Sequence, residues 1–200
     1  MKKVLFVLFL MLATYTLEAQ VQFMGIPVDG KVSEMKKQLK KKGFKNAPSD
    51  YGDEALVGKF YNREVLLMIT KNNKNIVCGV GVFFMKSISE YEGYDRTSTI
   101  KLYNELKYSF DNNENYLEVS PLLIESTPGL NYDRIEPDTD LWSDIKVKGV
   151  DYHSIYKQIP YEDFNAVHFS ITTDNFHYGM FQIILYYENL KNKTFGDEDL

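Results

Sequence analysis

Carboxylates crowd one short stretch of the chain around Trp142, which is the only tryptophan. The acids of this stretch are Asp133, Glu136, Asp138, Asp140 and Asp144. Asp138, Asp140 and Asp144 stand at i, i+2 and i+6, and calcium prefers such clustered oxygen ligands. The stretch lacks the central glycine and closing glutamate of an EF-hand loop. The pattern therefore allows a calcium site at these three residues, and with it a calcium-stabilised structural protein as an alternative function. A solvated acidic loop is the simpler interpretation.

The same acids, in the 133–144 segment, leave a hydrolase open as an alternative. Glycoside hydrolysis uses two carboxyl groups that face each other across a cleft, which a sequence does not reveal. The chain contains no Gly-x-Ser-x-Gly, no His-Glu-x-x-His and no phosphate-binding glycine loop. The sequence accordingly predicts no cofactor, and it favours a protein that is not an enzyme.

The remaining reactive side chains are those of His153, His168, His177 and Cys78. A metal site needs ligands that converge, and the alternation predicted for the C-terminal hairpin places His168 and His177 on different sides. Cys78 lies within an apolar run, where a cysteine usually packs as a small inert hydrophobe. We therefore predict three unrelated histidines and an unreactive thiol.

Aromatic residues are the strongest candidates for a contact surface, because they bring large contact area at a small entropic cost. Residues 116–160 form an irregular stretch, and a stretch this long without clear elements is often functional. We predict a non-enzymatic binding domain whose irregular stretch contacts a protein or a glycan. The rings expected to make this contact lie in or next to that stretch: Trp142, Tyr132, Tyr152, Tyr156 and Tyr161, together with Tyr91 and Tyr94.

The N-terminus has the order of a secretory signal. Lys2 and Lys3 precede an uncharged apolar run over residues 4–13, and a polar segment then ends at the small residue Ala19. The run is too short for a membrane span, which needs about 20 residues. We therefore expect residues 1–19 to be removed and the mature protein to be periplasmic or secreted, without stable membrane insertion.

The composition of the mature chain limits the partners that it suits and the bonds that can stabilise it. Removing residues 1–19 leaves 21 basic and 27 acidic residues, a net charge of −6, so nucleic acid is an unsuitable partner. A single cysteine permits no internal disulfide, which fits a bacterial exported protein stabilised by its core. Residues 20–200 have the size of one domain, which could consist of two similar halves, 20–95 and 96–200.

In the first half, a helix pattern begins with Val32, Met35 and Leu39 on one face. Asp29 or Gly30 stands where an N-cap belongs. Gly43 and Phe44 predict a Schellman closure in which Phe44 contacts Leu39. Strands are expected at residues 55–61, 64–70 and 76–84, and their short links predict an antiparallel meander.

In the second half, a helix is expected over residues 97–110, capped by Thr97 or Ser98. Residues 152–159 allow a short helix. Two strands close the chain, with a three-residue loop at 174–176 that sets Val167 opposite Ile183 and Phe169 opposite Phe181, forming one apolar face. The predicted fold class is α+β, an antiparallel sheet covered by helices in the order helix-βββ-helix-excursion-ββ.

Both ends of the chain carry recognisable features: Phe23 to Gly30, the helix through Leu39, Lys42-Gly43-Phe44, the strand from Ile183 to Asn189 and the ending Gly196 to Leu200. In these features the chain resembles small exported proteins of gut-type Gram-negative bacteria. These are capping and packing features, and the resemblance implies no functional residue. The order of helices and strands also loosely resembles β-lactamase-inhibitor-like modules, which is a likeness of architecture alone.

Overall fold

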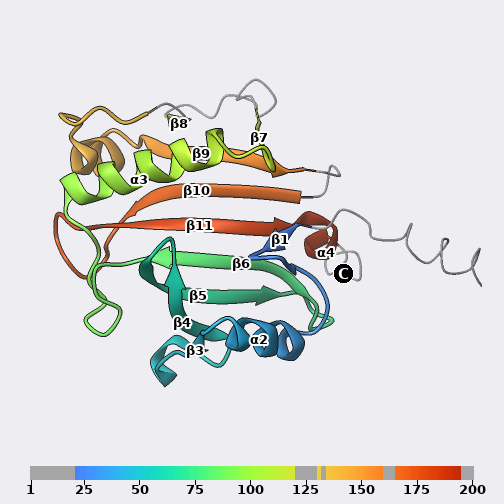
Figure 1. Cartoon of the computed structure of the whole chain (residues 1–200). Helices are drawn as coiled ribbons and strands as arrows, with labels where there is room; N and C mark the ends of the chain where they lie inside the picture. The colour runs from blue at the N-terminus through green and yellow to red at the C-terminus, as the bar shows by residue number, and fades with distance from the viewer. Residues whose placement is uncertain (1–20, 120–129, 132–133, 160–164, 195–200) are drawn as a thin grey trace, which may run out of the picture.

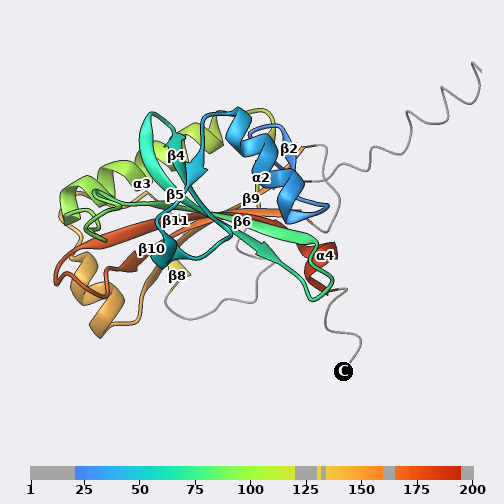
Figure 2. The same cartoon turned by 90° about the horizontal axis from the view of Figure 1, so that it is seen from below.

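The structure, a computed structural model, describes residues 21–119, 130–131, 134–159 and 165–194. One large antiparallel sheet runs through it in the order β3-β4-β5-β6-β11-β10-β9-β7 (Figure 1). The long helices α2 (Val32–Lys41) and α3 (Arg96–Asp111) lie on the same face of this sheet, as Figures 1 and 2 show together. The predicted α+β class with an antiparallel sheet is confirmed.

The first half forms the predicted meander. Its strands β4 (Ala55–Phe60), β5 (Arg63–Lys71) and β6 (Val77–Phe84) pair in sequence order. A short edge strand, β3 (Lys45–Asn46), and a 3-10 turn, η1 (Ser49–Tyr51), precede them. A separate two-stranded ribbon of β1 (Gln22–Phe23) and β2 (Ile26–Pro27) leads into α2.

The closure of α2 is the one that the sequence predicts. The amide of Phe44 donates to the Leu39 carbonyl at 3.2 Å, and the amide of Gly43 donates to the Lys40 carbonyl at 3.1 Å, which is the Schellman pattern. Gly43 has a φ of 97°, in the region that glycine favours. The predicted N-cap is wrong, because Lys31 occupies that position and makes no side-chain capping bond.

The second half repeats the order of a helix followed by antiparallel strands. After α3 come β7 (Tyr116–Glu118), β9 (Asp151–Gln158), β10 (Asn165–Thr173) and β11 (Phe181–Asn189). The short strand β8 (Leu130–Asn131) pairs with β9 in parallel, and a helical turn, η3 (Ser143–Val147), precedes β9. A short helix, α4 (Leu190–Thr194), follows β11.

The last strands of the two halves, β6 and β11, pair at the centre of the sheet. Alternate residues of each strand point under the helices and are buried, such as Val82 of β6 and Ile183 and Leu185 of β11. Ridges from the helices fill the same core through Met35, Leu39, Leu102, Leu106 and Phe110. The core therefore lies between one face of the sheet and the two helices.

Three expectations about the second half are wrong. Residues 152–159 form most of strand β9 rather than a helix, because Tyr152 and Tyr156 alternate with half-buried residues and point into the core. The hairpin register differs by four residues: Ile183 pairs with Ile171, and Val167 pairs with Tyr187. A shift by an even number leaves the apolar face unchanged, so the predicted face exists with other partners. The N-cap of α3 is Asp95, whose side chain accepts from the Ser98 amide.

In the part of the chain that the structure describes, no helix combines the length and apolar character needed to cross a bilayer.

Candidate functional site

Three segments that are distant in sequence meet at one end of the sheet. Strands β6 and β11 are antiparallel neighbours, with Phe84 opposite Ile183. The connection that leaves β6 (residues 85–95) must therefore lie beside the connection that enters β11 (residues 174–180). The turn η1 is joined to the first of these, because the Tyr51 hydroxyl donates to the Ile88 carbonyl at 2.5 Å.

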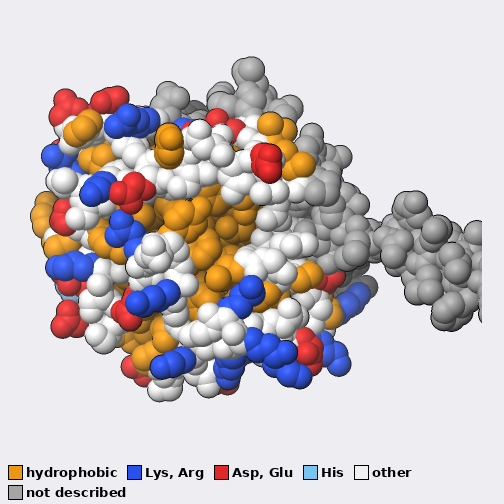
Figure 3. Space-filling model, in the orientation of Figure 1, with side chains coloured by type: hydrophobic (Ala, Val, Ile, Leu, Met, Phe, Trp, Pro, Cys, Tyr) orange, Lys and Arg blue, Asp and Glu red, His pale blue; other side chains and the backbone are white. Residues whose placement is uncertain are grey.

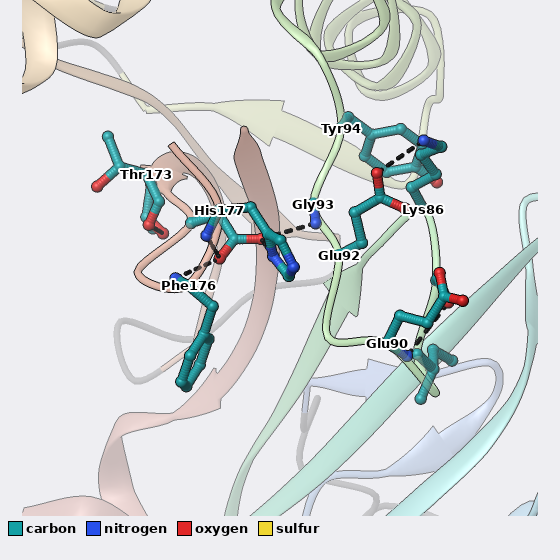
Figure 4. A network of polar contacts seen from close by, with 12 residues as sticks. Lys86, Glu90, Glu92, Gly93, Tyr94, Thr173, Phe176 and His177 are labelled. Atoms are coloured by element: carbon teal, nitrogen blue, oxygen red, sulfur yellow. Dashed lines mark hydrogen bonds and ion pairs between the residues drawn. The ribbon is translucent and has the colours of Figure 1, made fainter. Parts of the chain in front are cut away.

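A buried carboxylate ties the two connections together. One oxygen of Asp174 accepts from the amides of Phe176 at 2.8 Å and His177 at 3.2 Å, and the other accepts from the Gly93 amide at 2.7 Å (Figure 4). The His177 ring nitrogen lies 3.3 Å from that second oxygen. Burial alone would raise the pKa of Asp174, but the hydrogen bonds from these amides outweigh it and lower the pKa. The connection over residues 174–180 thus folds around the charged carboxylate of Asp174, which accepts these hydrogen bonds.

Close backbone contact adds to this link. Tyr94 and Phe181 exchange amide-to-carbonyl hydrogen bonds at 2.6 and 2.8 Å. A side chain at Gly93 would have its Cβ 2.4 Å from the Phe181 carbonyl oxygen. Only glycine allows the two backbones to approach this closely.

The residues 86–92 form a tight turn that presents Tyr91. Lys86 and Glu92 are joined by their backbones and by an ion pair of 2.7 Å (Figure 4). Tyr91 itself has a φ of 58°, an uncommon conformation for a bulky residue. The surrounding hydrogen bonds maintain this conformation, which directs the ring toward neighbouring rings.

Aromatic rings from all three segments form a continuous contact. Tyr91 stacks on Tyr51 with centroids 4.9 Å apart, and it lies 6.1 Å from Phe176. The pKa of Tyr51 rises to about 12, first because the hydroxyl is partly buried and then because Tyr91 lies beside it. On the other side of the hairpin tip, Tyr178 packs edge-on against Trp142 at 4.4 Å. We call these five residues, Tyr51, Tyr91, Trp142, Phe176 and Tyr178, the aromatic loop surface.

The tip of this surface faces solvent. Phe176 is 77% exposed and Tyr178 is 82% exposed, although loop tips are usually polar. An exposed ring gives up the transfer free energy that burial would supply, about 2 kcal/mol for a phenylalanine. Two such rings on a hairpin held by a buried carboxylate form a pre-organised apolar contact, the arrangement that binding sites use to limit the entropic cost of association.

The residues predicted to contact a partner do not all lie on the surface. Trp142 belongs to the aromatic loop surface. Tyr152 and Tyr156 are buried in the core, at 2% and 0% exposure, and their hydroxyls donate to Asp144 and Asp111. They therefore stabilise the domain from inside and do not reach its surface. Tyr132 and Tyr161 lie outside the described residues.

The predicted calcium ligands do not converge. Asp140 accepts from the Ser143 amide at 3.2 Å and so caps the turn η3. Asp144 accepts from Lys148 and from the Tyr152 hydroxyl, each at 2.7 Å. Hydrogen bonds from these two partners lower the pKa of Asp144, as expected for a structural carboxylate. Asp138 joins neither contact, and within the described residues no three His, Cys, Asp or Glu side chains form a metal-ligating group.

Two of the three histidines are neighbours. Because residues 151–158 form a strand beside β10, the rings of His153 and His168 lie 6.0 Å apart on the sheet face opposite the helices. Burial lowers the pKa of both rings. The Cys78 thiol lies 3.8 Å from the Thr70 hydroxyl and is partly buried.

Comparisons with protein-family models, curated proteins and solved structures gave no significant match to this chain. The resemblance to small exported proteins therefore stays a prediction.

Tyr91, like Trp142, is a predicted contact residue that belongs to the aromatic loop surface, whereas Tyr94 packs against the core. Three members of the surface were not predicted from the sequence. Two of them, Phe176 and Tyr178, could have been recognised, because two aromatic residues stand in a turn segment between Asp174 and Gly179. No sequence pattern indicates Tyr51, because its contact with Tyr91 depends on the tertiary fold.

Proposed function

We propose that this chain is an exported, non-enzymatic binding domain that contacts a protein partner through the aromatic loop surface. The observation that carries the proposal is the exposure of Phe176 and Tyr178 on a hairpin tip whose backbone is held by Asp174. Aromatic residues are enriched in the binding energy of protein interfaces. The export part of the proposal rests on the sequence of residues 1–19.

The surroundings of the tip also favour a protein partner. Charged side chains flank the rings, with Lys86 and Glu92 beside Tyr91, and with Lys146 5.8 Å from the Trp142 ring. An apolar centre with a polar rim is the usual anatomy of a protein interface. The rings come from four separate segments, so together they cover a wider area than a single stacking platform for one sugar.

Site-specific photo-crosslinking in the cell that makes the protein tests this proposal. A photoreactive phenylalanine analogue replaces Tyr178, and in a control it replaces Tyr108, which is 70% exposed on the outer side of α3. We expect a discrete crosslinked protein from position 178 that is absent from position 108. Equal crosslinking from both positions, or none from position 178, would refute the aromatic loop surface as the contact site.

A further inference from the structure

The outer side of α2 carries four lysines on adjacent turns. Burial of Val32, Met35 and Leu39 fixes the orientation of the helix, so that the residues between them point to solvent. Lys36, Lys37, Lys40 and Lys41 follow one another at intervals of one and three residues along the helix and, with Ser33, line one shallow hollow. Figure 3 shows blue side chains gathered over this helix. We call these four residues the lysine face.

Among the described residues, no lysine of this face forms an ion pair within 4.0 Å, although the charge of Lys36, after that of Lys71, helps to lower the pKa of Glu54. Ion pairs within 4.0 Å elsewhere join Lys71 to Glu54, Lys86 to Glu92 and Lys107 to Glu118. For the lysine face the contact present is a hydrogen bond from the Lys36 ammonium to the backbone carbonyl of Asp53. Like charges on adjacent turns of a helix repel one another, so an external anion would relieve a real electrostatic cost.

Charge is distributed unevenly between the two halves of the chain. Residues 20–95 contain 12 basic and 9 acidic side chains, whereas residues 96–200 contain 9 basic and 18 acidic ones. A protein with a negative net charge thus carries a positive face on one helix. An anion close to this helix is therefore attracted locally although the whole protein is negatively charged.

We propose that the lysine face binds a linear anionic polysaccharide. A thin chain with regularly spaced sulfate or carboxylate groups can follow four lysines along one helix, and lysine ammonium groups act as point charges that need no fixed fork geometry. Acidic residues more distant than about 8 Å are screened at physiological salt, so the acidic half does not repel such a chain. The proposal uses a different surface from the aromatic loop surface and is independent of it.

A membrane surface fits the lysine face less well. Membrane-bound amphipathic helices insert apolar side chains beside their lysines, but the apolar residues of α2 are buried in the core. A flat anionic bilayer would also meet a wide area of the protein, including its acidic half. A narrow polymer contacts the helix alone.

Heparin serves as the probe polyanion, and its binding is measured by titration calorimetry at several salt concentrations. Four lysine contacts predict a plot of log K against log salt with a slope of about −3, which is about a 60-fold loss of affinity between 50 and 200 mM salt. The variant with Lys36, Lys37, Lys40 and Lys41 all changed to Gln should lose at least about tenfold in affinity at 50 mM salt and most of this slope.

A matched control changes four exposed lysines elsewhere, Lys59, Lys74, Lys101 and Lys146, to Gln. It has the same net charge as the test variant and should bind heparin within about twofold of the wild type. Equal losses in both variants, or no binding by the wild type at 50 mM salt, would overturn the proposal. Tighter binding to phosphatidylglycerol vesicles than to heparin would also overturn it, in favour of a membrane.

Discussion

Asp174 is the residue on which the shape of the aromatic loop surface depends most. Its side chain has no exposed area and accepts hydrogen bonds from three backbone amides. The substitution Asp174→Asn keeps the size of the side chain but removes its charge. It also turns one oxygen into an NH2 group, which then faces an amide donor.

The expected cost follows from these contacts. A hydrogen bond to a charged group contributes about 1.5–3 kcal/mol, and Asp174→Asn loses at least one such bond and leaves a buried donor without an acceptor. We expect the free energy of unfolding to fall by about 2–3 kcal/mol. For a domain of this size, that lowers the melting temperature by about 4–12 °C.

The pH dependence gives a second test with a definite sign. The pKa of Asp174 is lower in the folded protein than in the unfolded chain, so its charged form stabilises the fold above the unfolded pKa of about 3.9. This stability is lost as the pH falls through the folded pKa. The difference between wild type and Asp174→Asn should therefore be constant between about pH 5 and 8 and should shrink below about pH 4.

Thermal unfolding monitored by circular dichroism measures both effects. Asp140→Asn is the matched control, because the same change is made at an exposed carboxylate that caps the turn η3. We expect this control to shift the melting temperature by less than about a third of the Asp174→Asn shift. Equal shifts in the two variants, or a wild-type advantage that grows below pH 4, would refute the reasoning about Asp174.

Four further substitutions test the packing around the site, at the end of α2 and in the core by urea unfolding. Gly93→Ala places a Cβ 2.4 Å from the Phe181 carbonyl oxygen and should lower the free energy of unfolding by about 3 kcal/mol; a stabilised variant would contradict this contact. Gly43→Ala should lower it by about 1–2 kcal/mol through the positive φ alone, since no atom lies within 4 Å of the added Cβ; an unchanged value would contradict this. Tyr103 and Ser154 share a buried hydrogen bond of 2.8 Å, so Tyr103→Phe and Ser154→Ala should each cost about 1–3 kcal/mol and the double variant less than their sum. Strictly additive losses would show that the two hydroxyls do not interact.

Local patterns were sufficient to predict the end of α2 and the three-stranded meander of the first half. Gly43 and Phe44 close α2 through contacts within five residues of the chain. Strands β4, β5 and β6 are joined by short links, so each pairs with its neighbour in sequence. Their positions follow from residues that are close along the chain.

The second half required contacts that are distant in sequence. Tyr152 and Tyr156 are four residues apart, a spacing that fits both a helix and a strand. The segment forms a strand because it pairs with β10. The hairpin register could not be predicted from alternation, because a shift of four residues preserves the buried face. The bond that positions the loop joins Asp174 to Gly93, 81 residues earlier.

The candidate site was predicted only in part for the same reason. Trp142 could be found from the sequence, because it is a single large aromatic residue in an irregular stretch. Tyr51 and Tyr91 belong to the other half of the chain. Tyr91 meets Phe176 only because β6 and β11 are neighbours at the centre of the sheet, and Tyr51 joins them through its contact with Tyr91.

The most direct test of the proposed binding function is the affinity of the partner recovered by crosslinking for three variants of the protein. Phe176→Ala and Tyr178→Ala should each weaken binding by at least about tenfold, while Tyr108→Ala, an equally exposed ring on α3, should stay within about twofold of the wild type. Unchanged affinity after both loop substitutions, in variants that remain folded, would contradict contact through the aromatic loop surface.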